Sequence, residues 1–222
     1  MKYRIPLPAL DTHTVRRYAG LKSSDFPPER IREAAQTVRL VAEGQGSVRY
    51  YPYDSANHTI IAESGNLTLS SDAIRRHLAD AEQIAVMAVT IGSAVERSID
   101  EAFSTGEYSH ALLLDAAATT ATEACADHLN RTITAEARRR GLFTAFRFSP
   151  GYGDWDITVQ PDIVRLSEGN SIGITVTESS MLLPRKSVTA VVPLRAQKAE
   201  ALAHGCSVCT YQTCLSRKEI TP

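Results

Sequence analysis

The residues best suited to binding chemistry lie in one short stretch, from Arg147 to Trp155, which reads RFSPGYGDW. Arg147 is a permanent planar cation that can hold a carboxylate with two hydrogen bonds. Pro150 and Gly151 require a turn, and the glycine leaves backbone amides and carbonyls open to a ligand. Tyr152 and Trp155 each offer an aromatic face beside that turn. The stretch therefore suits a small zwitterionic ligand that carries a ring.

A purely structural role would explain the same residues. Pro-Gly turns beside aromatic residues are common at the corner between a strand and a loop. In that arrangement Tyr152 and Trp155 fill the core, and Arg147 pairs with a surface carboxylate. The residues of this stretch alone leave both interpretations open.

A long helix is predicted shortly before this stretch, over residues 108–140. Its apolar residues recur at the helical period and form one stripe: Leu114, Ala118, Ala121, Cys125, Leu129 and Ile133. A second face carries the small residues Ala116, Thr119 and Thr120, with Glu123 as its only acid. Small side chains let a ligand or another backbone approach closely, so Glu123 is a candidate ligand-binding residue. The alternative is a solvated surface acid.

Three segments resemble, in order, the activation domain of cobalamin-dependent methionine synthase, a family that binds S-adenosylmethionine. Residues Thr122 to Leu129 (TEACADHL) are similar to the ligand-facing helix of that family. Residues Arg147 to Tyr152 have its Arg-x-x-x-Gly-Tyr pattern. Residues 176–188 (VTESSMLLPRKSV) resemble its segment with Thr-Glu-Ser, Pro and Ser-Val. The resemblance covers roughly residues 110–195.

The resemblance implies that S-adenosylmethionine is the ligand of this chain. The implied binding residues are Glu123, Arg147, Ser149, Pro150, Gly151, Tyr152, Glu178 and Ser179. Arg147 would hold the ligand carboxylate, while Glu123 and Glu178 would face the positive ammonium or sulfonium group. The backbone of residues 148–151 would read the adenine edge, and Tyr152 would pack against the ligand.

Three cysteines, Cys206, Cys209 and Cys214, form a C-x2-C-x4-C pattern near the end of the chain. Thiolates spaced in this way can share one metal ion. They fit an iron–sulfur cluster with a non-cysteine fourth ligand, or a zinc site completed by His204. A redox-active Cys-x-x-Cys dithiol and ordinary free thiols are the alternatives. The family that the chain resembles has no such tail, so the pattern indicates a stand-alone variant.

Composition and charge argue against several classes of function. The chain of 222 residues is 43% hydrophobic and 22% charged, which is ordinary for a soluble globular protein. A net charge of −1 gives no reason to expect binding to nucleic acid or to an anionic membrane. No apolar run is long enough to cross a bilayer, and residues 1–6 lack an apolar signal core. We therefore expect a cytoplasmic protein that binds neither nucleic acid nor membrane.

A partial cobalamin fingerprint begins at Asp11. Base-off cobalamin carriers use Asp-x-His-x-x-Gly, in which the histidine binds cobalt, and Asp11 and His13 match its first half. Arg16 stands where the glycine should be, and no glycine-rich segment follows. We therefore expect Asp11 to cap a short helix that ends near Tyr18, and cobalamin to be held by a partner.

The order of predicted elements indicates an α+β fold with a mixed, mostly antiparallel sheet and long helices packed against it, as in the activation domain. Helices are predicted over residues 28–41, 72–78 and 94–103, and a buried strand over residues 84–92. Residues 172–176 and 187–192 are predicted to be antiparallel strands joined across Pro184. We divide the chain into an N-terminal α/β portion (1–80), an S-adenosylmethionine-binding core (81–195) and a cysteine-containing tail (196–222).

The resemblance implies a reactivation subunit for a cobalamin-dependent methionine synthase or a related corrinoid protein. Such a subunit binds S-adenosylmethionine and supports reductive methylation of cob(II)alamin, with the corrinoid partner and an electron donor supplied in trans. It is a component of a methyltransferase system of methionine biosynthesis. One alternative is a regulatory or scaffold subunit that senses S-adenosylmethionine. Another is a small-molecule methyltransferase, which the missing Rossmann-type glycine loop disfavours.

Overall fold

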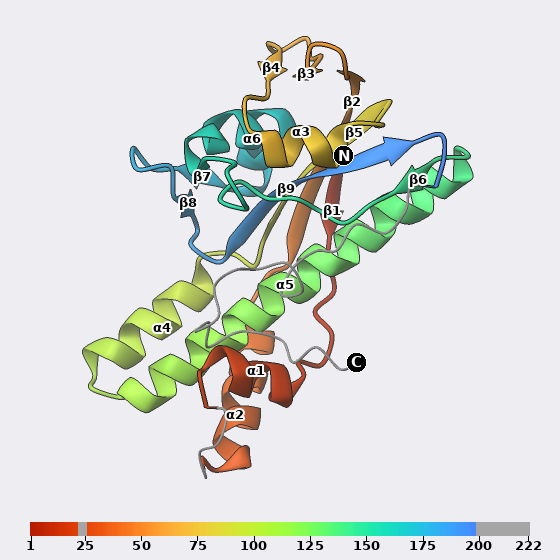
Figure 1. Ribbon diagram of the computed structural model, residues 1–222. Helices are drawn as coiled ribbons and strands as arrows, with labels where there is room; N and C mark the ends of the chain where they lie inside the picture. The colour runs from red at the N-terminus through yellow and green to blue at the C-terminus, as the bar shows by residue number, and fades with distance from the viewer. Residues whose placement is uncertain (22–25, 199–222) are drawn as a thin grey trace.

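A seven-stranded antiparallel sheet runs through the computed structural model, which describes residues 1–21 and 26–198 (Figure 1). Its strand order is β4-β3-β2-β5-β9-β6, and β1 pairs with β2. Its strands are β1 (Lys2–Arg4), β2 (Gln45–Asp54), β3 (Thr59–Ile60), β4 (Leu67–Thr68), β5 (Gln83–Thr90), β6 (Phe143–Thr144) and β9 (Ser187–Arg195). A separate two-stranded sheet contains β7 (Thr175–Val176) and β8 (Leu182–Leu183).

Helices cover both faces of the large sheet (Figure 1). They are α1 (Thr12–Tyr18), α2 (Pro28–Val41), α3 (Asp72–Leu78), α4 (Ala94–Ser104), α5 (Tyr108–Arg139) and α6 (Gln160–Ser167), with short 3-10 helices η1 (Ile157–Val159) and η2 (Gly169–Ile172). α1, α2, α4 and α5 form the larger core with one face, while α3 and α6 pack on the other. The predicted α+β architecture is confirmed.

The central strand β5 is buried because its sequence, QIAVMAVT, is apolar almost throughout. β2 pairs along one edge and β9 along the other, so that Val86 lies opposite both Arg49 and Val191. Successive side chains of a strand point to opposite faces. Met87 accordingly packs in the core under α5, and Val86 in the core under α3 and α6. The buried strand predicted over residues 84–92 is confirmed.

The long helix α5 spans 32 residues and crosses the sheet diagonally (Figure 1). Every residue of the predicted apolar stripe is at most 2% exposed. The approach of α5 to β2 depends on Gly46, because a Cβ there would lie only 2.9 Å from Cδ2 of Leu129 and from Cδ1 of Ile5. The absence of a side chain at Gly46 therefore lets α5 lie close to the sheet. The packing of α5 at this point also fixes where the polar face of the helix lies.

Asp11 caps α1 as predicted. Its carboxylate accepts hydrogen bonds from the backbone amides of His13 at 3.2 Å and Thr14 at 2.9 Å. These bonds satisfy amides that the first turn of a helix leaves without partners. The capping interpretation of this partial fingerprint is confirmed.

The pairing predicted for residues 172–176 and 187–192 is wrong. η2 occupies residues up to Ile172, and Gly173 then turns the chain with φ of 84°. Only Thr175 and Val176 form a strand, and they pair with β8. β9 pairs instead with β5 over a long register, because both strands are apolar and buried on two faces, whereas β7 offers only two residues for pairing.

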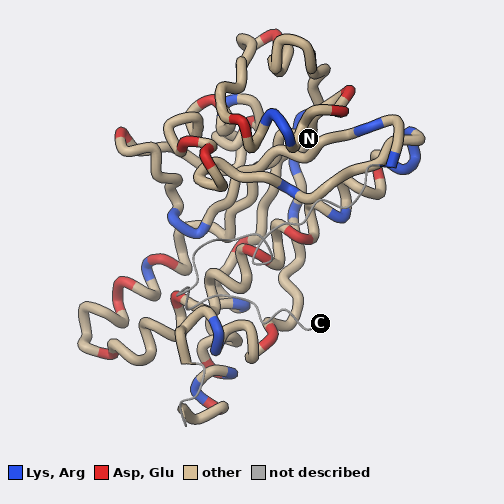
Figure 2. The backbone as a smooth tube through the Cα atoms, viewed as in Figure 1, with Lys and Arg blue, Asp and Glu red and all other residues tan. Residues whose placement is uncertain are grey.

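The predicted N-terminal portion and core contribute to the same sheet. β2 pairs with β5 from Gln45 opposite Thr90 to Pro52 opposite Gln83, and the division at residue 80 stays a prediction. Basic and acidic positions are interspersed along the chain (Figure 2). Across residues 1–21 and 26–198, no helix combines the length and the apolar character needed to cross a membrane.

Candidate functional site

Arg147 lies where the sheet meets α5. Its neighbour Phe148 forms a bridge with Val191 of β9, and each residue's amide donates to the other's carbonyl at 2.9 Å. This bridge holds the backbone while the Arg147 side chain reaches α5. There Nη2 donates to Oε2 of Glu123 at 2.6 Å, and Nη1 donates to Oδ1 of Asp127. The structure thus brings together Arg147 and Glu123, which the sequence predicted to serve one ligand.

The charge of Arg147 is stabilised by both carboxylates. Its side chain is only 19% exposed, against 38% for Glu123 and 54% for Asp127. Burial by itself would lower the pKa of Arg147, but the hydrogen bonds and negative charges of Asp127 and Glu123 outweigh it and raise that pKa. The guanidinium is therefore a partly buried, permanent cation held by two acids one helical turn apart.

The turn that follows the arginine is held by its own backbone. The Gly151 amide donates to the Trp155 carbonyl at 2.7 Å, and the Tyr152 amide donates to the Ser149 carbonyl at 3.1 Å. Pro150, which is part of this turn, is buried. Gly151 has φ of 89°, and a Cβ there would meet no heavy atom within 4 Å. The backbone at Gly151 is thus accessible from outside, as the sequence led us to expect.

The two aromatic residues of this turn differ in exposure. Trp155 is 3% exposed and packs against Phe148 at a ring separation of 6.0 Å. Trp155 therefore belongs to the core, as the purely structural interpretation of this stretch proposed. Tyr152 is 52% exposed and meets Phe148 edge-on at 5.8 Å. Partial burial of the phenol and the negative charge of Glu123 raise the pKa of Tyr152.

Tyr18, at the end of α1, also lies close to this ion pair. Partial burial raises the pKa of Tyr18, and the charge of Glu123 raises it further, while the positive charges of Arg17 and Arg147 act in the opposite direction. Tyr18 also raises the pKa of Tyr152 slightly, so each phenol lies within electrostatic range of the other. Sequence reasoning missed Tyr18 because it is far away in the chain and belongs to none of the three family-like segments. We refer to Tyr18, Glu123, Asp127, Arg147 and Tyr152 as the Arg147 cluster.

Glu178 and Ser179 lie in the hairpin between β7 and β8. Oγ of Ser179 lies 3.0 Å from Oγ1 of Thr177, and the Thr177 amide donates to the Met181 carbonyl at 2.9 Å. Among the hydrogen bonds and ion pairs of the described residues, none joins Glu178 or Ser179 to Arg147. Their place in a ligand site therefore stays a prediction.

The end of the same segment does reach α5. Nζ of Lys186 contacts Oδ1 of Asp115 at 2.8 Å and donates to Oγ1 of Thr119 at 2.9 Å. Thr119 is followed at four-residue intervals by Glu123 and Asp127, so these side chains share one face of the helix. The prediction that Glu123 is the only acid on this face is therefore wrong. The three family-like segments therefore meet along a single face of α5, with a lysine near one end and an arginine near the other.

Asp154 connects the turn to α3. The hydroxyl of Ser71 donates to Oδ1 of Asp154 at 2.5 Å, and the amides of Asp72 and Ala73 each donate to its carboxylate at 3.0 Å. These hydrogen bonds, with that from Ser71 the strongest, lower the pKa of Asp154 to about 2. The sequence predicted the helix over residues 72–78, but not this carboxylate from a distant turn at its start.

Replacing Asp154 with asparagine is expected to lower the thermal unfolding midpoint at neutral pH. Because the folded pKa of about 2 lies below the ordinary value of 3.8, the carboxylate stabilises the folded state above that ordinary value. The stabilisation is lost as pH falls toward about 2. Thermal unfolding followed by circular dichroism between pH 7 and pH 2 should show the two midpoints converging as acid is added.

The matched control for this prediction is Asp80→Asn, which removes one exposed aspartate from the turn after α3. A gap between wild type and Asp154→Asn that persists undiminished at the acid end would contradict the prediction.

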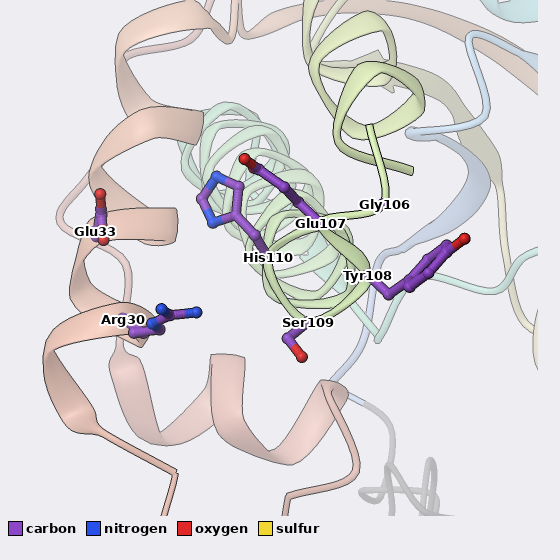
Figure 3. A pocket seen from close by; sticks show the side chains of 7 residues that line it. All are labelled: Arg30, Glu33, Gly106, Glu107, Tyr108, Ser109 and His110. Carbon is purple, nitrogen blue, oxygen red and sulfur yellow. The ribbon is translucent and has the colours of Figure 1, made fainter. Parts of the chain in front are cut away.

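A surface depression of about 480 Å³ lies where α2 faces the start of α5 (Figure 3). It is lined by Arg30, Glu33, Gly106, Glu107, Tyr108, Ser109 and His110. All of these residues except His110 are exposed, and the depression shares no residue with the Arg147 cluster. Its solvated, mixed-charge walls give no reason to assign it a ligand.

The predicted metal ligands Cys206, Cys209 and Cys214 lie outside the described residues. Within residues 1–21 and 26–198, no group of three or more His, Cys, Asp or Glu side chains is arranged to hold a metal ion. Cys125 is fully buried, and burial raises its pKa to about 11. It is therefore the small core residue that the helical stripe indicated.

Comparison with solved structures identifies the class of fold. The chain is similar to a structure described as the MetH reactivation domain bound to AdoHcy, with a TM-score of 0.61 and 17% identity over 90% of this chain and 83% of that one. The fold is that of a methionine synthase reactivation domain. The family model for the vitamin B12-dependent methionine synthase activation domain matches residues 57–200, and the chain belongs to this family. A comparison with curated proteins finds no match.

Proposed function

We propose that this chain binds S-adenosylmethionine at the Arg147 cluster and acts as a reactivation subunit for a cobalamin-dependent methionine synthase or a related corrinoid protein. One observation carries the proposal: Arg147, Glu123 and Tyr152, from two family-like segments, converge on one face of α5. Family membership supports the same ligand and the same system.

The proposed contacts follow from the charges of the ligand. S-adenosylmethionine carries a carboxylate, an ammonium, a sulfonium and an adenine ring. Arg147 binds the carboxylate through its planar guanidinium, and Glu123 faces the ammonium or sulfonium. Tyr152 and Tyr18 pack against the adenosyl group, and the open backbone around Gly151 contacts the adenine edge. Glu178 and Ser179 belong to the proposed site through the family pattern of their segment.

The reaction that we propose requires little chemistry from this chain. One electron and the methyl group of S-adenosylmethionine convert cob(II)alamin, held by the partner, into methylcobalamin and leave S-adenosylhomocysteine. The electron comes from a separate donor protein. No side chain has to remove a proton, so the chain contributes proximity and orientation.

Reconstitution tests the proposed function. Calorimetry should detect S-adenosylmethionine binding in the micromolar range to the chain alone. A methionine synthase fragment loaded with cob(II)alamin but lacking its own activation domain serves as the partner, with a chemical one-electron reductant. Methylcobalamin should form, with one S-adenosylhomocysteine released per cobalt, only when all components are present.

The outcomes of this experiment separate the candidate functions. A chain that fails to bind S-adenosylmethionine would refute the proposal. Binding that leaves the partner's spectrum unchanged would refute the reactivation role and favour a regulatory or scaffold subunit that senses S-adenosylmethionine.

We further propose that Cys206, Cys209 and Cys214 bind an iron–sulfur cluster or zinc rather than form a permanent disulfide. Their spacing allows three thiolates to reach one ion or cluster, and three free thiols close together would oxidise readily. Anaerobic purification should give either a brown protein whose visible absorbance bleaches with dithionite, or a colourless protein with bound zinc. A cluster would make the tail an electron relay, and zinc would make it structural.

The control for this prediction is Cys125→Ala, which removes the buried core cysteine and should leave the metal content unchanged. The double variant Cys206→Ser/Cys209→Ser should lose the metal. Anaerobically purified protein that contains no metal, with all three tail thiols titratable, would refute the prediction.

A further inference from the structure

Both terminal nitrogens of Arg147 donate to carboxylates of the chain itself. Nη2 donates to Glu123 at 2.6 Å, and Nη1 donates to Asp127. A free carboxylate binds arginine best when two parallel hydrogen bonds engage adjacent nitrogens of the guanidinium. A ligand carboxylate that binds across Nη1 and Nη2 must therefore compete with one of these two acids.

Asp127 is the acid better placed to be displaced. Its side chain is 54% exposed, against 38% for Glu123, so its carboxylate regains water at little cost when it leaves. Within the described part of the chain, Arg147 is the only side chain that forms a hydrogen bond or ion pair with Asp127. Glu123, by contrast, is the acid proposed to face the ammonium or sulfonium of the ligand, and its charge also acts on Tyr18 and Tyr152.

We propose that Asp127 is an internal competitor of the ligand: it occupies the position of the ligand carboxylate on Arg147 and is displaced when the ligand binds. This inference rests on the proposed function. Asp127 thereby lowers the affinity for every ligand that uses Arg147, whereas the affinity for a ligand that lacks a carboxylate does not depend on it. A ligand without that group leaves the Arg147–Asp127 pair in place and gains nothing from the arginine.

The test compares two variants with two ligands by calorimetry. Asp127→Asn keeps the shape of the side chain and removes its charge. S-adenosylmethionine is compared with its decarboxylated form, which keeps the adenosyl, sulfonium and ammonium groups. Asp127→Asn should bind S-adenosylmethionine roughly two- to fivefold more tightly than wild type, because an exposed ion pair of modest strength no longer competes. Its affinity for the decarboxylated ligand should not increase.

Asp115→Asn is the matched control. Asp115 lies on the same helix, is 49% exposed and pairs with Lys186 instead of Arg147, so its replacement changes the net charge equally without freeing the arginine. Tighter binding of S-adenosylmethionine by Asp127→Asn alone supports the inference. Equal effects of the two variants, unchanged affinity, or weaker binding of both ligands by Asp127→Asn would overturn it. Failure of the wild-type chain to bind S-adenosylmethionine would instead refute the proposed function.

Discussion

Replacing Arg147 with alanine is expected to weaken S-adenosylmethionine binding by about 2–5 kcal/mol, or at least roughly thirtyfold in Kd. The guanidinium is mostly buried between the sheet and α5, so water cannot readily replace it beside the ligand carboxylate. Its loss also leaves Glu123 and Asp127 without their shared cation. Calorimetric titration of wild type and variant under the same conditions measures the effect.

The control for this prediction is Arg49→Ala. Arg49 also pairs with a carboxylate, that of Glu168 at 2.5 Å, but it lies on β2 and outside the Arg147 cluster. Its replacement removes the same charge and should leave the ligand affinity unchanged. Circular dichroism should show that both variants are folded at the titration temperature. Equal affinity of Arg147→Ala and wild type would remove Arg147 from the proposed site.

Replacing Leu129 with alanine is expected to lower the free energy of unfolding by about 2–5 kcal/mol, the cost of deleting a buried leucine side chain. Leu129 is 0% exposed and packs where α5 approaches β2, beside Gly46. The resulting cavity cannot close easily, because the backbone of β2 is fixed by its pairing with β5. Urea unfolding at neutral pH measures the change in the midpoint.

Leu112→Ala is the control for this stability prediction, because Leu112 is on the same helix but 45% exposed. Surface substitutions of this kind usually change the free energy of unfolding by less than about 0.5 kcal/mol. If the two leucine variants had similar unfolding midpoints, the packing assigned to Leu129 would be wrong.

Local patterns in the sequence were sufficient to predict most of the elements. The apolar period along residues 108–140 predicted α5 within one residue of its ends, because a helical stripe consists of apolar residues that recur every three or four positions along the chain. The apolar run at residues 84–92 likewise predicted β5, and the capping oxygen of Asp11 predicted the start of α1. Each of these signals depends on residues only a few positions apart.

Strand pairing was harder to predict, since it depends on which distant segments offer matching surfaces. Residues 172–176 are as β-like in composition as many strands, yet the chain turns at Gly173 and only two of these residues form a strand. β9 pairs with β5 because burial on both faces stabilises a long apolar register. The composition of a segment describes that segment alone, and it does not show which of two possible partner strands gives the longer buried register.

The sequence by itself determined the helices, the buried central strand and the three segments that place this chain in the methionine synthase activation domain family. Only the tertiary structure decided which side chains surround Arg147. It showed that Trp155 is a core residue, that the charge of Glu123 acts on Tyr18 of a distant helix, and that Asp127 pairs with Arg147 alongside Glu123. The physical reason is that ion pairs and burial depend on distances across the fold, and those distances follow from how closely α5 packs on the sheet.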